Sequence, residues 1–160
     1  MRERVNERWA DPGQIFRPSE KTFREAHIRA VQDIAAQYFE YPNAEFPHLR
    51  TFVNEPEVGQ RIFTNFGREL VPDIVVLEWP EKIPLIVAEV VTDDLLNEKT
   101  AREKWLPESR LVGVQLYLYV PAGSASDAKK LLKKAGIKNV SLRTWRNITG
   151  LRTVDIARIR

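Results

Sequence analysis

Apolar residues follow a helical period in the first part of the chain and strand-like patterns after it. Between residues 19 and 39 they recur every three or four positions, which predicts a helix that begins at an N-cap, Ser19, and ends before Pro42. Short runs rich in β-branched and aromatic residues then predict strands over 48–53, 61–66, 70–78 and 85–92. The run from Leu85 to Thr92 is almost continuously apolar, which is typical of a central strand buried on both faces.

The second half of the chain alternates helices with strands. Thr92 to Asp94 offer caps for a helix over 94–105, which we expect to stop before Pro107. Further elements are predicted as strands over 112–120, 140–145 and 153–159 and a helix from Ser124 or Ser126 to Ala135. A strand meander followed by helix–strand alternation predicts an α/β fold, with a mixed central sheet flanked by helices.

Length and composition indicate one globular domain with a short arm. The chain has 160 residues, and its 43% hydrophobic and 29% charged residues are typical of a folded protein. Residues 1–18 are charged and contain the breakers Pro12, Gly13 and Pro18, so we expect an N-terminal arm over 1–18 and a single domain over 19–160. The absence of cysteine excludes disulfides, cysteine-based zinc sites, iron–sulfur clusters and a cysteine nucleophile.

The sequence also bears on location. No apolar stretch approaches the roughly 20 residues that a membrane-spanning helix needs. The first residues, from Met1 to Arg8, are too highly charged for a signal peptide. We therefore expect a cytoplasmic protein without a membrane partner.

Positive charge is concentrated at the end of the chain. Residues 129–160 contain ten Lys and Arg residues and one acidic residue, Asp155, a formal charge of +9, whereas residues 1–128 carry −6. Such asymmetry is typical of a protein that binds a polyanion, and an amphipathic helix face in solvent explains it equally well. The candidate nucleic-acid-binding residues are Lys129, Lys130, Lys133 and Lys134, continued by Arg143 and Arg146.

Two carboxylates occupy positions where apolar side chains are expected. Asp73 precedes the run Ile74 to Leu77, and Glu89 lies inside the run from Leu85 to Val91. A carboxylate in a central strand pays a large desolvation penalty unless it is paired or binds a metal. Two of them on adjacent strands can converge on one divalent cation, and hard cations such as Mg²⁺ prefer oxygen ligands.

These residues resemble a known pattern. Pro72-Asp73, a spacer of fifteen residues and then Glu89-Val90-Val91 resemble the PD-(D/E)xK nuclease superfamily, over roughly residues 19–120. The resemblance implies an αβββαβ restriction-endonuclease-like core, here with an extra αβ unit at the C-terminus. It also implies Mg²⁺- or Mn²⁺-dependent hydrolysis of phosphodiester bonds in DNA, with Asp73 and Glu89 as metal ligands, and it is compatible with a homodimer.

The sequence departs from the superfamily at the third motif position, because Val91 stands where the lysine belongs. In one branch of small bacterial restriction-endonuclease-like proteins the lysine is displaced onto the following helix, which makes Lys104 the first candidate here and Lys99 the second. Two alternatives remain. In the first alternative, catalysis has been lost and the domain binds nucleic acid or a protein partner. In the second, the fold is unrelated and the carboxylates are ion-paired, for example with Lys99, Arg102 or Lys104.

Other residues have weaker claims to the site. Glu25 on the first helix is a candidate extra metal ligand, with an exposed helical residue as its alternative. Gln115, on the strand after the second helix, is a candidate polar residue whose side chain reaches the site of Asp73 and Glu89. His27 shares the apolar face of its helix with Phe23 and Val31, so a hydrogen-bonded core histidine is expected rather than a ligand.

Overall fold

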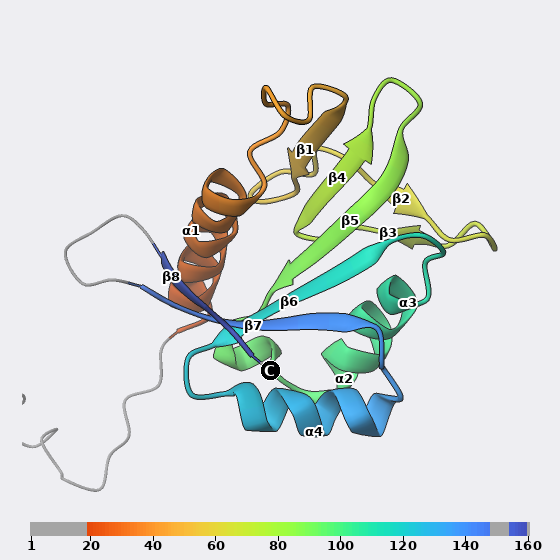
Figure 1. Cartoon of the computed structure of the whole chain (residues 1–160). Coiled ribbons are helices and arrows are strands. Elements are labelled where there is room, and N and C mark those ends of the chain that lie inside the picture. Colours follow the sequence, from red (N-terminus) through yellow and green to blue (C-terminus); the bar gives the residue numbers. More distant parts are fainter. Residues whose placement is uncertain (1–18, 148–153, 160) are drawn as a thin grey trace, which may run out of the picture.

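The protein has an α/β fold built on a six-stranded mixed sheet, as the sequence predicts (Figure 1). The computed structural model describes residues 19–147 and 154–159, so the predicted arm over 1–18 lies outside the described residues. The strand order is β1-β4-β5-β6-β7-β8, with β5, β6 and β7 parallel and the other neighbours antiparallel. The strands are β1 (Leu49–Val53), β4 (Ile74–Glu78), β5 (Ile83–Val90), β6 (Gln115–Pro121), β7 (Val140–Asn147) and β8 (Val154–Arg158). A separate hairpin joins β2 (Ile62–Phe63) to β3 (Glu69–Leu70).

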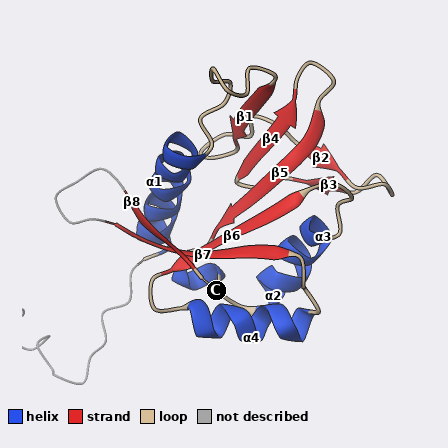
Figure 2. Ribbon diagram, in the orientation of Figure 1, coloured by secondary structure: helices blue, strands red, loops and turns tan. Residues whose placement is uncertain are grey.

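Helices cover the two faces of this sheet (Figure 2). The long helix α1 (Glu20–Tyr38) packs on one face, where its apolar side buries against β1, β4, β5 and β6. The other face is covered by α4 (Ala125–Ala135) and by a helical segment after β5. That segment comprises η2 (Asp93–Leu95), α2 (Glu98–Thr100), η3 (Ala101–Trp105) and α3 (Leu106–Ser109). In the described ranges, no helix is long and apolar enough to cross a membrane.

The predicted strand over 70–78 is wrong in one respect, because it is split in two. Leu70 ends β3, and β4 begins only at Ile74. Pro72 has no N–H to donate to a sheet ladder, and the side chain of Asn54 binds the chain there instead: its Nδ2 donates to the Pro72 carbonyl at 2.6 Å. The Asn54 N–H also donates to the Asp73 carbonyl at 2.9 Å. This clamp fixes the backbone of Asp73 at the start of β4.

The predicted helix over 94–105 also differs from the structure. Asp93–Leu95 form only a 3₁₀ turn, and the helix proper begins after Asn97, whose side chain accepts a hydrogen bond from the Thr100 N–H at 2.9 Å. It continues past Pro107 to Ser109, because a wider π-helical turn over Ala101–Trp105 places the proline in the first turn of α3. The Glu103 carbonyl, which the missing Pro107 N–H leaves free, accepts a hydrogen bond from Arg68 Nη2 at 3.0 Å.

Candidate metal centre

A pocket of about 240 Å³ opens between α1, the start of β4, the end of β5 and the helical segment after β5. Both carboxylates singled out in the sequence line it, and so does Lys104. Asp73 and Glu89 are almost fully buried, with 4% and 3% of their surface exposed. The pairing of β4 with β5 explains why they meet, because the antiparallel register places Ile74, next to Asp73, opposite Ala88, next to Glu89.

The Asp73 carboxylate is held by two donors. Its Oδ2 accepts a hydrogen bond from the Val90 N–H at 2.8 Å and another from Nε2 of His27 at 3.1 Å. Burial alone would raise the pKa of Asp73, but the hydrogen bond and charge of His27, together with the charge of Lys104, hold it below its ordinary value. Asp73 is therefore ionised and already oriented toward the pocket.

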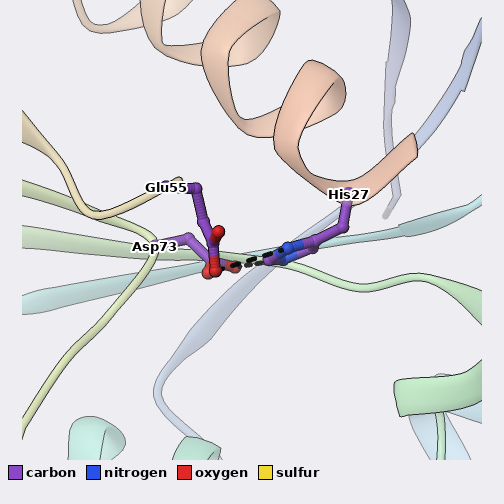
Figure 3. Close-up of side chains that lie close together, drawn as sticks. All are labelled: His27, Glu55 and Asp73. Atoms are coloured by element: carbon purple, nitrogen blue, oxygen red, sulfur yellow. Dashed lines mark hydrogen bonds and ion pairs between the residues drawn. The ribbon is translucent and has the colours of Figure 1, made fainter. Parts of the chain in front are cut away.

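His27 joins Asp73 to a second acidic residue, Glu55 (Figure 3). Its Nδ1 lies 3.7 Å from Oε1 of Glu55, which follows β1. Burial alone would lower the pKa of His27, yet the Asp73 hydrogen bond and the charges of Asp73 and Glu55 outweigh burial and raise it. One ligand atom from each of the three residues lies within 4.8 Å of the others, so the cluster could hold a metal ion.

The sequence indicated this cluster only in part. His27 is buried and hydrogen-bonded, as expected for a core histidine, but its partners are the carboxylates of the pocket. Glu55 is a member of the cluster that the sequence does not single out. Its neighbour Asn54 and the following Pro56 do signal an ordered turn, but no local pattern shows that the turn faces α1.

Lys104 faces Glu89 from the helical segment. Its Nζ lies 3.2 Å from Oε2 of Glu89, while Oε1 of Glu89 is buried and has no hydrogen-bond partner. Burial raises the pKa of Glu89 well above its ordinary value, and the charges of Asp73 and Glu108 add to this effect, whereas the Lys104 charge opposes it. The Glu89 charge in turn raises the pKa of Lys104, so Lys104 is a cation. Of the two lysines considered from the sequence, Lys104 lines the pocket and Lys99 is exposed.

Glu108 is a further buried acid that sequence reasoning missed. Only 1% of its surface is exposed, and its side chain interacts with that of Glu89. Oε2 of Glu108 and Oε1 of Glu89 are both buried and find no donor among the described residues. Burial raises the pKa of Glu108 to about 7, against the opposing effects of the Glu89 hydrogen bond and the Lys104 charge.

Two other predicted site residues point elsewhere. The Glu25 side chain is 67% exposed and lies 3.8 Å from Lys21, as its alternative interpretation expected. Nε2 of Gln115 donates to the Leu116 carbonyl at 3.1 Å and to Oγ of Ser141 at 3.2 Å, on the sheet rather than in the pocket. The structure therefore does not bring Glu25 or Gln115 to Asp73 and Glu89.

The predicted basic residues divide into separate groups. All four lysines, Lys129, Lys130, Lys133 and Lys134, are exposed on α4, opposite its buried Ala128 and Leu132. Lys134 forms an ion pair with Glu98. Arg143 stacks over Tyr117 at 5.2 Å, within the apolar cluster that packs on α1, and Arg146 pairs with Asp155 at 3.0 Å. Arg143 therefore lies on the α1 face of the sheet and does not continue the lysine stripe of α4.

Comparisons with known proteins do not add to this description. No family model, curated protein or solved structure matches the chain. What the fold and site define is an α/β protein with a mixed six-stranded sheet and a buried cluster of one histidine and two acidic residues that could hold a metal.

Proposed function

We propose that this protein is a metal-dependent phosphodiesterase of the PD-(D/E)xK type that cleaves DNA. The observation that carries the proposal is the position of Lys104, whose ammonium lies 3.2 Å from Glu89 in the same pocket as Asp73. Val91 leaves the usual motif without its lysine, and Lys104 supplies a cation beside the same carboxylate from the next helical segment. The element order, with one helix, a meander and then helix–strand alternation, also agrees with this superfamily.

The donor groups in the pocket suit a divalent cation. Asp73 with His27 and Glu55, or Asp73 with Glu89, would hold it, and the unpartnered buried Oε1 of Glu89 is an acceptor available for such an ion. Carboxylates suit Mg²⁺ and Mn²⁺, whereas an imidazole ligand favours the softer Mn²⁺ over Mg²⁺. A bound ion would supply Lewis acidity for hydrolysis. Lys104 would stabilise the negative charge that develops on the phosphoryl oxygens, and Asp73, already ionised, would bind without losing a proton.

One observation favours the alternative of a catalytically inactive domain that binds nucleic acid or a protein partner. Both carboxylates singled out in the sequence already have a partner within the protein, because Asp73 is hydrogen-bonded to His27 and Glu89 lies 3.2 Å from the Lys104 ammonium. A pocket whose charges are balanced in this way is satisfied without an ion. Activity measurements distinguish the two functions.

The test of the proposed function is nicking of supercoiled plasmid in Mn²⁺, Mg²⁺ and EDTA. We expect cleavage in the metal buffers and none in EDTA. Lys104→Ala should lower the cleavage rate by about 100-fold, the loss typical of one group that stabilises transition-state charge. Lys99→Ala is the matched control, because it removes an exposed lysine of α2, and it should retain the wild-type rate. Absence of cleavage with every metal, or equal rates in both variants, would contradict the proposal.

DNA binding by α4 is a separate prediction of the proposed function. Lys130 and Lys133 are exposed on the stripe and are chosen because Lys134 is already paired with Glu98. A lysine that neutralises one phosphate contributes about 1 to the slope of log affinity against log salt. In EDTA, the double variant Lys130→Gln/Lys133→Gln should lower this slope by about 2. Lys82→Gln, which replaces a lysine stacked on Trp79, is the control. An unchanged slope would show that α4 does not contact the DNA backbone.

A further inference from the structure

The β2–β3 hairpin ends in a fully exposed aromatic side chain. Phe66 at its tip is 99% exposed, and Phe63 on β2 is 61% exposed. The tip is ordered by its own hydrogen bonds, since the Thr64 N–H donates to the Arg68 carbonyl and the Gly67 N–H to the Thr64 carbonyl, each at 2.9 Å. Gly67 takes the left-handed conformation, with a φ of 79°, that the turn requires. A short ordered turn therefore presents Phe66 to solvent, where an aromatic side chain gains nothing for folding.

A groove of about 260 Å³ lies beside this tip. We call it the hairpin groove, and it lies between the hairpin on one side and α3 and the residues that follow α3 on the other. Among its lining residues are Asn65, Phe66, Arg68, Pro107, Arg110 and Val112. Two of these are arginines and none of the described lining residues is acidic, so the groove is suited to an anion. An exposed aromatic ring beside arginines and an amide is the combination that binds single-stranded nucleic acid, through base stacking and phosphate contacts.

The hairpin groove is connected to the candidate metal centre through one helical segment. Arg68 of the hairpin donates to the carbonyl of Glu103, and the next residue, Lys104, reaches Glu89. Arg110 in the groove comes directly after α3 and follows Lys104 by only six residues. A strand whose phosphate lies at Lys104 would thus extend to the groove within a few nucleotides.

We infer that the β2–β3 hairpin binds unpaired nucleotides next to the candidate metal centre, with Phe66 stacked on a base and Arg110 facing the phosphate backbone. The inference rests on the proposed function for the class of the ligand, a nucleic acid. Unpaired nucleotides are the better fit because both faces of a base inside a duplex are covered by its neighbours, whereas an unstacked base leaves a face for the ring. The substrate class would then be single-stranded DNA, or duplex DNA with a single-stranded flap or gap.

The test measures binding without catalysis. Fluorescence anisotropy in EDTA compares a labelled single-stranded oligonucleotide with a blunt duplex of the same sequence. Loss of one stacking ring should weaken single-strand binding of Phe66→Ala by about 10-fold, while duplex binding stays within about 2-fold. Phe66→Trp should restore single-strand binding because it keeps a stacking surface. Since Phe66 is fully exposed, we expect all three proteins to have the same thermal midpoint, which is measured alongside.

The outcomes separate this inference from the proposed function. Three results would overturn the inference. In the first, Phe66→Ala binds the single strand with wild-type affinity; in the second, the variant loses affinity equally for single strand and duplex. In the third, the wild type binds neither DNA. A change of oligomeric state in Phe66→Ala, measured by analytical ultracentrifugation without any change in DNA binding, would assign the ring to a protein interface and would also overturn it. If single-strand binding depends on Phe66 but plasmid is not cleaved in any metal, the inference stands and the nuclease proposal fails.

Discussion

Replacement of Asp73 by asparagine is expected to lower metal-dependent cleavage by about 1000-fold or more. Asparagine keeps the size of the side chain and an oxygen that accepts the Val90 N–H, so the start of β4 should remain intact. It removes a negative charge that both candidate ligand sets share. One set is Asp73 with His27 and Glu55, and the other is Asp73 with Glu89. Plasmid nicking in Mn²⁺ measures the effect. Glu25→Gln, at an exposed acidic residue of α1, is the matched control and should cleave like the wild type.

Metal binding gives a second readout of the same variant that does not depend on turnover. Mn²⁺ should raise the thermal midpoint of the wild type, because an ion that binds only the folded state stabilises it, and should not raise that of Asp73→Asn. His27 must lose its proton before its imidazole can bind an ion, so Mn²⁺ affinity should increase as the pH rises through the raised pKa of His27. Equal stabilisation of the variant and the wild type by Mn²⁺ would show that Asp73 is not a ligand.

The second large effect concerns stability and Glu108. Its pKa of about 7 in the folded protein lies above its ordinary value of 4.5, so the unfolded chain loses this proton first. The stabilisation contributed by the buried neutral acid is therefore complete below pH 4.5 and is lost as the pH rises to about 7. The difference between the two pKa values corresponds to about 3 kcal/mol of unfolding free energy.

Glu108→Gln should remove this pH dependence. Glutamine has nearly the same shape as a protonated glutamic acid, does not ionise, and keeps a donor group on the side chain. Between pH 4.5 and pH 8 the variant should lose about 3 kcal/mol less unfolding free energy than the wild type. Urea unfolding in EDTA at several pH values measures this difference. Glu103→Gln, at an exposed residue of the same helical segment, should follow the wild type. Parallel curves for Glu108→Gln and the wild type would show that Glu108 is not held as a neutral acid in the folded protein.

Several features of the site follow from the sequence because their signals are local. Asp73 and Glu89 are conspicuous as charged residues in apolar strands, and two such strands joined by a short loop pair side by side, which brings the two carboxylates to one pocket. Lys104 could be selected because it lies on the helix that follows the Glu89 strand. The element order and the mixed sheet follow in the same way from hydrophobic period and turn residues.

Other features depend on contacts between distant segments. His27, Glu55 and Glu108 come from a helix, a turn and a helix end, and each resembles an ordinary residue in its own segment until the fold places a carboxyl group opposite it. The π-helical turn that carries the helix past Pro107 is likewise stabilised by Arg68, which is remote in the sequence.

The sequence by itself determined the α/β class and the two buried acids, because both signals are contained in short stretches of chain. The spacing of apolar residues gives the type of each element, and an acid inside an apolar strand is recognised from its immediate neighbours. Only the tertiary structure decided which cations and acids face them, because a pKa and a ligand set depend on atoms a few ångströms away in space, whatever their separation along the chain.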